Sequence, residues 1–166
     1  MGMTWSATAV DAQRTAALLR APQHIIEILY ADYDADKVAG RVAYLDKAWH
    51  AIHFVLNQSA WEGEPPWNWA IFGGEPVSQD PDEDAPRHVP ADHVRQIAAA
   101  LATLPADEFA RRYDAQALAD ADIYPDVIWL RDGDEAKDYV VSYYAELIGF
   151  YTDAAARGDS VFTSIG

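Results

Sequence analysis

The stretch MTWSATA, residues 3–9, determines how this chain begins to fold. It contains β-branched and aromatic residues of the kind enriched in strands, and so does SVFTSI, residues 160–165, near the other end of the chain. Helical patterns fill most of the sequence between the two. We therefore predict an α+β fold, a mostly helical single domain over residues 1–166 with a small sheet that includes the N- and C-terminal strands.

One helix is predicted over residues 41–58, after an acidic connection at residues 31–36. Its apolar residues recur at helical spacing and would form one stripe facing the core. These residues are Val42, Leu45, Trp49, Ile52 and Leu56.

The remaining elements follow from caps, prolines and glycines. The longest helix is predicted over residues 134–157, with acidic residues at its start and Gly158 placed to end it. Shorter helices, a brief strand and a charged surface loop complete the pattern. The helices are expected over residues 11–20, 22–30, 67–72, 90–104, 105–113 and 114–121, the strand over 75–79 and the loop over 80–88.

The composition excludes several classes of function. The formal net charge of -15 at pH 7 would repel the phosphates of a nucleic acid. The same charge favours a basic protein or a cation as partner, or serves solubility alone, which is the more common role of surface acidity. Without cysteine, the chain has no disulfide, thiolate nucleophile or iron–sulfur ligand. It shows neither a signal-peptide pattern nor the ~20 apolar residues of a membrane span. We expect a cytoplasmic protein that uses no cofactor and binds neither nucleic acid nor membrane.

A polar group of side chains borders the apolar stripe of the helix predicted over residues 41–58. Asp46, His50, His53 and Asn57 fall on one face, where a carboxylate and two imidazoles can hold a metal or act as an acid–base pair. The alternative is structural: His53 packs on Trp49 with its ring N–H bonded to a backbone carbonyl, and Asp46 pairs with His50 at the surface. His50 and His53 are therefore weak metal candidates, and no metal site is predicted.

The aromatic stretch WEGEPPWNWAIFGGE, residues 61–75, holds three of the six tryptophans. Its prolines and glycines predict a shaped turn after the helix. We expect Trp61 to close over that helix as a buried plug, which would contribute about 1.5 to 3 kcal/mol. If this turn forms a ligand site, Trp61 should meet Asp46 and His53 there, with Trp49 and Trp69 as further lining residues.

Two further features complete the list of candidates. Asp80, Asp82 and Asp84 match the first ligand positions of a calcium loop, but alanines replace its turn glycine and its bidentate glutamate. The long helix carries four tyrosines that either pack in the core or line a pocket for an aromatic or sugar ligand. They are Tyr139, Tyr143, Tyr144 and Tyr151. No phosphate-binding loop, dinucleotide fingerprint or serine-nucleophile elbow is present.

Several landmarks occur in an order that resembles the YfbM-like family, a group of bacterial proteins with a domain of unknown function. They are MGM, LDKAWHAIHFVL, WEGEPPWNWAIFGG, PRHVPADHVRQIAAAL, ADIYPDVIW and YYAELIGFYTDAAARGDSVFTSIG. The resemblance covers nearly the whole chain and implies a mostly helical α+β domain with its termini in a small sheet. It supplies no catalytic residues. The matching positions are Leu45, Asp46, Lys47, Trp49, His53, Phe54, Trp61, Gly73, Gly74, Ile123, Tyr124 and Pro125, and the absence of His50 from the pattern favours His53 with Asp46 as the pair.

Besides a purely structural subunit, two functions remain open from the sequence. The first is a non-catalytic binding or protein-interaction module, for example one that neutralises a basic partner through electrostatic complementarity. The second is a small-ligand or metal-binding protein, or a hydrolase-type enzyme, that uses a pocket formed by His53, Asp46 and the tryptophan-rich turn.

Overall fold

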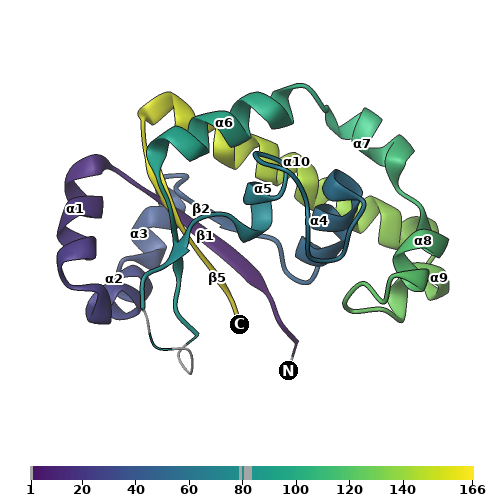
Figure 1. Ribbon diagram of the computed structural model, residues 1–166, viewed down its shortest axis with the longest axis horizontal. Coiled ribbons are helices and arrows are strands. Elements are labelled where there is room, and N and C mark those ends of the chain that lie inside the picture. The colour runs from purple at the N-terminus through teal and green to yellow at the C-terminus, as the bar shows by residue number, and fades with distance from the viewer. Residues whose placement is uncertain (1, 79, 81–83) are drawn as a thin grey trace.

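The computed structural model describes residues 2–78, 80 and 84–166. Within these residues, a five-stranded antiparallel sheet joins the two ends of the chain. The spatial order is β2-β1-β5-β4-β3. The strands are β1 (Trp5–Val10), β2 (Val42–Tyr44), β3 (Glu75–Pro76), β4 (Arg87–Val89) and β5 (Ser160–Ile165). The two terminal strands therefore pair at the centre of the sheet, and the predicted α+β fold is confirmed (Figure 1).

The pairing of β1 with β5 sorts the side chains of both strands onto two faces. The register runs from Trp5 opposite Ile165 to Val10 opposite Ser160. Since successive side chains alternate, Trp5, Ala7 and Ala9 share one face, which is buried in the main core. Ser6 and Thr8 lie on the other face, which we call the outer face of the sheet.

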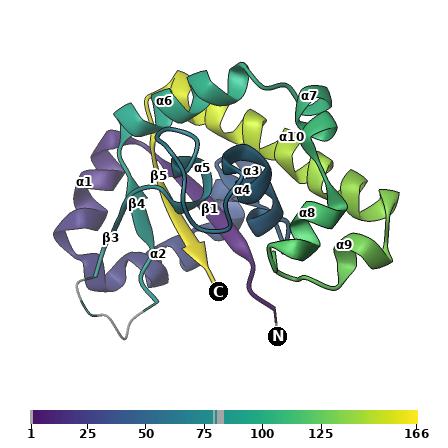
Figure 2. The same cartoon turned by 45° about the vertical axis from the view of Figure 1, so that its right-hand side comes forward.

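The main core lies between the inner face of the sheet and a layer of helices. The long helix α10 (Asp134–Arg157) and α6 (Ala91–Ala102) run side by side across this layer, as Figures 1 and 2 show. The layer is completed by α4 (Trp49–Asn57), α5 (Trp69–Phe72), α7 (Ala106–Arg112), α8 (Ala115–Asp120) and α9 (Ile128–Arg131). No helix in the described part of the chain has the length and apolar character needed to cross a membrane.

The helix α10 follows its sequence prediction at both ends. Its buried stripe includes Val140, Tyr144, Leu147 and Tyr151, and Gly158 ends it in the left-handed conformation at φ +75°. The hydroxyl of Tyr144 donates to the Leu104 carbonyl at 2.7 Å, and that of Tyr151 donates to the Ala70 carbonyl at 2.8 Å. These two tyrosines are therefore core residues with satisfied hydroxyls.

The outer face is partly covered by helices from the first quarter of the chain. They are α1 (Ala12–Arg20), a 3-10 turn (Pro22–His24), α2 (Ile25–Ala31) and α3 (Tyr33–Val38). Asp11 caps α1 by accepting from the Arg14 N–H at 2.8 Å, as its sequence position predicts. A small second core joins these helices to the sheet through Val10, Leu18, Ile25 and Phe162.

The single helix predicted over residues 41–58 is wrong in its first part. Val42–Tyr44 pairs with β1 as a strand, and the Leu45 N–H donates to the Trp5 carbonyl at 3.0 Å. Asp46 then adopts a left-handed conformation at φ +47°, and the helix begins only at Trp49. Apolar spacing over a short run cannot distinguish a helix from a buried strand, and here pairing with β1 decides.

Two shorter predictions also need correction. Part of the acidic connection at residues 31–36 belongs to α3, because Arg14 binds Asp36 through both carboxylate oxygens at 2.9 and 3.0 Å and binds Asp32 at 3.0 Å. The loop predicted over residues 80–88 ends in a strand, because Arg87–Val89 pairs with β5. Of the three aspartates of the incomplete calcium loop, Asp82 lies outside the described residues.

A buried ion cluster ties β5 to the rest of the fold. Asp159 is 1% exposed, and its carboxylate accepts from Arg41 and from Arg157, each at 2.8 Å. Arg41 directly precedes β2, and Arg157 is the last residue of α10. One carboxylate therefore fixes the chain at the point where α10 turns into the central strand.

We expect Asp159→Asn to lower the free energy of unfolding by about 3 kcal/mol, because it leaves two guanidinium groups without their buried counter-charge. Urea denaturation at pH 7 measures this. The control is Asp107→Asn, which removes a carboxylate paired with Arg111 at the surface at 3.4 Å and should cost less than about 0.5 kcal/mol. Equal losses in the two variants would contradict the proposed role of Asp159.

Candidate functional site

The helix α4, which carries the predicted histidine site, lies inside the molecule. Trp49 is 2% exposed, His50 1% and His53 0%. The ring of Trp49 stacks on His50 at 4.9 Å and on Tyr124 at 5.9 Å, measured between ring centres. Because both imidazoles are buried, each can be stable only if its ring nitrogens find partners inside the protein.

His50 uses both ring nitrogens to hold backbone groups. Its Nδ1 accepts from the Tyr124 N–H at 3.0 Å, so this nitrogen carries no proton, and Nε2 donates to the Ala60 carbonyl at 2.9 Å. These bonds join His50 to two later segments of the chain, ten and 74 residues further along. His50 therefore acts as a crosslink between loops.

His53 makes an equivalent pair of contacts. Its Nε2 donates to the Glu62 carbonyl at 3.1 Å, and Nδ1 faces the side-chain amide of Asn57 at 3.3 Å. The same amide also donates to the carbonyls of His53 and Trp67. The bond from His53 to a backbone carbonyl is the one that the structural alternative predicts. The carbonyl belongs to Glu62 in the aromatic turn.

Burial lowers the pKa of both histidines. For His53 the pKa falls to about 4, mainly because burial disfavours the charged ring, although the bond to the Glu62 carbonyl opposes this shift. For His50 burial also lowers the pKa, against the opposing bond to the Ala60 carbonyl. Both rings are neutral at pH 7 as a result.

Asp46 does not lie on the face of α4. It stands in the turn between β2 and α4, where its carboxylate accepts from the Tyr139 hydroxyl at 2.9 Å. The predicted alignment of Asp46 with His50, His53 and Asn57 fails because it needs a continuous helix from residue 46, and Asp46 is in a left-handed turn. Asp46 belongs instead to a tyrosine-rich surface near β2.

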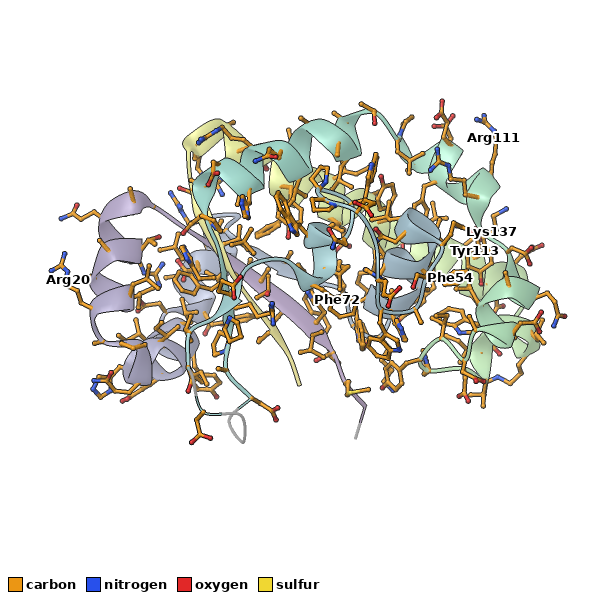
Figure 3. The ribbon with its side chains drawn as sticks, viewed as in Figure 1. Arg20, Phe54, Phe72, Arg111, Tyr113 and Lys137 are labelled. Carbon is orange, nitrogen blue, oxygen red and sulfur yellow. The ribbon has the colours of Figure 1, made fainter. Side chains whose placement is uncertain are left out.

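Trp61 is not the buried plug of the aromatic turn. It is 64% exposed and lies on the rim, with its ring centre 4.4 Å from His50 and 5.8 Å from Phe72. Phe72, labelled in Figure 3, closes over α4 instead, 4.5 Å from His53 and 5.9 Å from Trp49. Phe72 takes this place because α5 is held against the sheet, where the ring N–H of Trp5 in β1 donates to the Ile71 carbonyl at 3.1 Å.

The remaining tryptophan of the predicted site points elsewhere. Trp69 is half-buried and stacks on His93 of α6 with ring centres 3.9 Å apart. Within the part of the chain that the structure describes, no three side chains of the histidine, aspartate or glutamate type come together as a metal site. The structure thus brings Trp49, His50, Trp61 and His53 together around Phe72 and separates Trp69 and Asp46 from them.

A hollow lies on the outer face of the sheet, where no site was predicted from the sequence. It encloses about 470 Å³. Ser6, Thr8 and Ser164 line its floor, and the exposed face of α2 lines one side. The hydroxyl oxygens of Ser6 and Ser164 lie 3.1 Å apart across β1 and β5. Only the register of the two terminal strands reveals this polar floor, because the two serines are 158 residues apart in the sequence.

Tyrosines and aliphatic side chains form the walls of this hollow. Tyr30 is 85% exposed, Ile26 55% and Tyr44 44%, and all three line it. A second hollow of about 310 Å³ shares Ile26 and Pro86 with the first, so the two hollows are adjacent. We call the two hollows together the sheet groove. None of the described residues that line it is lysine, arginine or histidine.

We expect the free energy of unfolding to decrease as the pH is lowered, because the buried His53 must then take up a proton. The folded pKa of about 4 lies below the ordinary value near 6.5, so the unfolded chain binds the proton more tightly. The stabilisation is complete above pH 6.5 and is lost as the pH falls towards 4, by an amount on the order of 2 kcal/mol. Urea denaturation at pH 7.5 and 4.5 should show a smaller difference for His53→Gln than for the unaltered protein. The exposed His24→Gln serves as control, and an unchanged pH dependence in His53→Gln would exclude this role.

We expect Gly63→Ala to destabilise the aromatic turn. A Cβ atom at this position would meet the Asn57 side chain, which holds both His53 and Trp67. The expected loss is about 1 to 3 kcal/mol in thermal or urea unfolding. In contrast, Gly149→Ala lies on the exposed side of α10, where an added Cβ would meet no atom within 4 Å apart from the backbone of its own helix. This substitution should stabilise the protein by about 0.5 to 1 kcal/mol. A neutral Gly63→Ala would mean that the turn is loosely packed.

Comparisons with known proteins agree with this fold. The fold is similar to that of YfbM from Escherichia coli, whose crystal structure is described as that of a protein of unknown function, with a TM-score of 0.72 and 20% identity over 98% of this chain and 99% of that one. At this identity the likeness concerns the fold alone. No curated protein matches the sequence. A family model described as a domain of unknown function, DUF1877, matches residues 1–164. The resemblance to YfbM-like proteins is therefore confirmed, and the chain belongs to the DUF1877 family.

Proposed function

We propose that this protein is a non-catalytic binding module that receives a basic segment of a partner protein in the sheet groove. The observation that carries the proposal is the groove itself, which is lined by tyrosines, aliphatic side chains and hydroxyls and by no basic side chain among the described residues. Concave, largely apolar surfaces with a few converging polar groups are the usual form of binding sites.

The chemistry of the groove supports binding rather than catalysis. Ser6 and Ser164 place two hydroxyls on the floor, but a serine nucleophile needs a base within hydrogen-bonding reach. None of the described residues that line the groove is a histidine or a lysine. The buried histidines of α4 hold backbone groups through their ring nitrogens. Neither imidazole is therefore free to accept a proton from a substrate in this arrangement.

The charge of the chain supports a basic partner. The formal net charge is -15, and exposed arginines such as Arg20 and Arg111 lie at opposite ends of the molecule in Figure 3. An anionic surface attracts and orients a cationic segment before contact, and it disfavours acidic competitors. Because the two hollows are adjacent, an extended peptide can contact both of them, whereas a compact metabolite would fill only one.

A small-ligand site at the aromatic turn is the second candidate. Trp61 exposes most of its ring while it lies 4.4 Å from His50, so a planar ligand could stack on its open side. This version of the predicted pocket uses Trp61 at the rim, next to the buried His50, and does not use Asp46 or Trp69.

We expect fluorescein-labelled hexalysine to bind the protein and Tyr30→Ala to weaken that binding at least fivefold, because Tyr30 exposes its ring within the groove. Fluorescence anisotropy at low salt measures the dissociation constants. Trp61→Ala is the control, since Trp61 does not line the groove and its loss should leave the affinity unchanged. If only Trp61→Ala weakens binding, the peptide binds at the aromatic turn and not in the groove. If the unaltered protein and both variants bind equally, the peptide is held only by general charge attraction.

A further inference from the structure

We propose that Asp46, together with Tyr44, Tyr139 and Tyr143, anchors one lysine ammonium group of the bound segment at the β2 end of the sheet groove. This inference rests on the proposed function and adds the residue type that the groove selects. We call the four residues the anchor site.

The Asp46 carboxylate is held by a hydrogen bond from Tyr139 but has no basic partner among the described residues. Its Oδ2 accepts from the Tyr139 hydroxyl at 2.9 Å, and that hydroxyl in turn accepts from the Lys47 N–H at 3.1 Å. Among the described residues, no lysine, arginine or histidine forms an ion pair with Asp46. The Lys47 ammonium lies beside Gly2 and the Tyr124 hydroxyl. The carboxylate is therefore available to a cation from outside the chain.

Aromatic rings stand next to this carboxylate. Tyr139 and Tyr143 are one turn apart on α10 and meet edge to face, with ring centres 5.1 Å apart and an interplanar angle of 81°. Tyr143 is half-buried, so part of its ring remains accessible. Ring faces attract an ammonium group through their negative potential, and a neighbouring carboxylate adds a full charge to that attraction.

Tyr44 connects the anchor site with the sheet groove. It lies opposite Ser6 on β2, lines the groove and precedes Asp46 by two residues. Burial and the nearby carboxylates of Asp46 and Glu146 raise the pKa of Tyr143, and Tyr44 is close enough to add to this when it is ionised, so these groups surround the Tyr143 hydroxyl. A segment lying in the groove can thus extend a lysine past Tyr44 to Asp46.

The backbone holds the anchor site in place before a ligand arrives. Asp46 stands at φ +47°, and its own carbonyl accepts from the backbone N–H of Trp5 in β1 at 3.2 Å. Tyr139 fixes the carboxylate from α10. Groups that are already ordered lose little conformational freedom on binding, which favours affinity and selectivity.

The test compares hexalysine with hexa(Nε-acetyl-lysine), both labelled with fluorescein, on the unaltered protein and on three variants. Asp46→Asn keeps the shape and tolerates the left-handed backbone, so thermal unfolding should show a folded protein. We expect it to weaken hexalysine binding about tenfold and to leave binding of the acetylated peptide unchanged. Asp153→Asn makes the same change of charge at an exposed position of α10 and should have little effect.

The third variant, Tyr143→Ala, removes a ring without changing the charge and should weaken hexalysine binding at least threefold. If Tyr30→Ala weakens binding while Asp46→Asn and Tyr143→Ala do not, the anchor site is excluded and the groove remains. If Asp46→Asn and Asp153→Asn weaken binding equally, the attraction is general and the anchor site is also excluded. If neither Tyr30→Ala nor any of these three variants changes the affinity, or if hexalysine does not bind, both the anchor site and the proposed function are excluded.

Discussion

The pairing of β1 with β5 is the interaction on which the rest of this structure depends. Six registered residue pairs place the two termini at the centre of the sheet, so every other strand is added at one side of this pair or the other. The same pairing sends Trp5 into the core, where its ring N–H holds the Ile71 carbonyl and so positions the aromatic turn. It also presents the hydroxyls of Ser6 and Ser164 together on the outer face, where helices leave a groove uncovered.

The two histidines of α4 illustrate how chemically suggestive residues can be structural. Each imidazole replaces, inside the protein, hydrogen bonds that loop backbone groups would otherwise make to water. His50 secures residues 60 and 124, and His53 secures residue 62, so both fasten chain segments that lack regular structure. Their neutral state is a consequence of burial and is also the state in which one nitrogen can donate while the other accepts.

How far the sequence predicts the fold and the site depends on the range of the interactions involved. The bounds of α10 follow from local signals, namely its apolar spacing, its acidic first turn and Gly158. The helix predicted over residues 41–58 was wrong in its first part because Val42–Tyr44 finds its partners in β1, more than 30 residues earlier. Trp61 was expected in the core, but Phe72 fills that space because Trp5 and Tyr151 hold the α5 carbonyls from below.

The sequence by itself determined the fold class, the terminal strands, most of the helices and the strongly acidic character of the chain, since all of these depend on composition and on local periodicity. Only the tertiary structure decided which polar residues stand together. Asp46 lies beside α10 tyrosines more than 90 residues away and not beside His53, and the groove combines side chains from both ends of the chain. The physical reason is that a site depends on sheet register and on the faces that helices leave open, and these arise from contacts between distant segments.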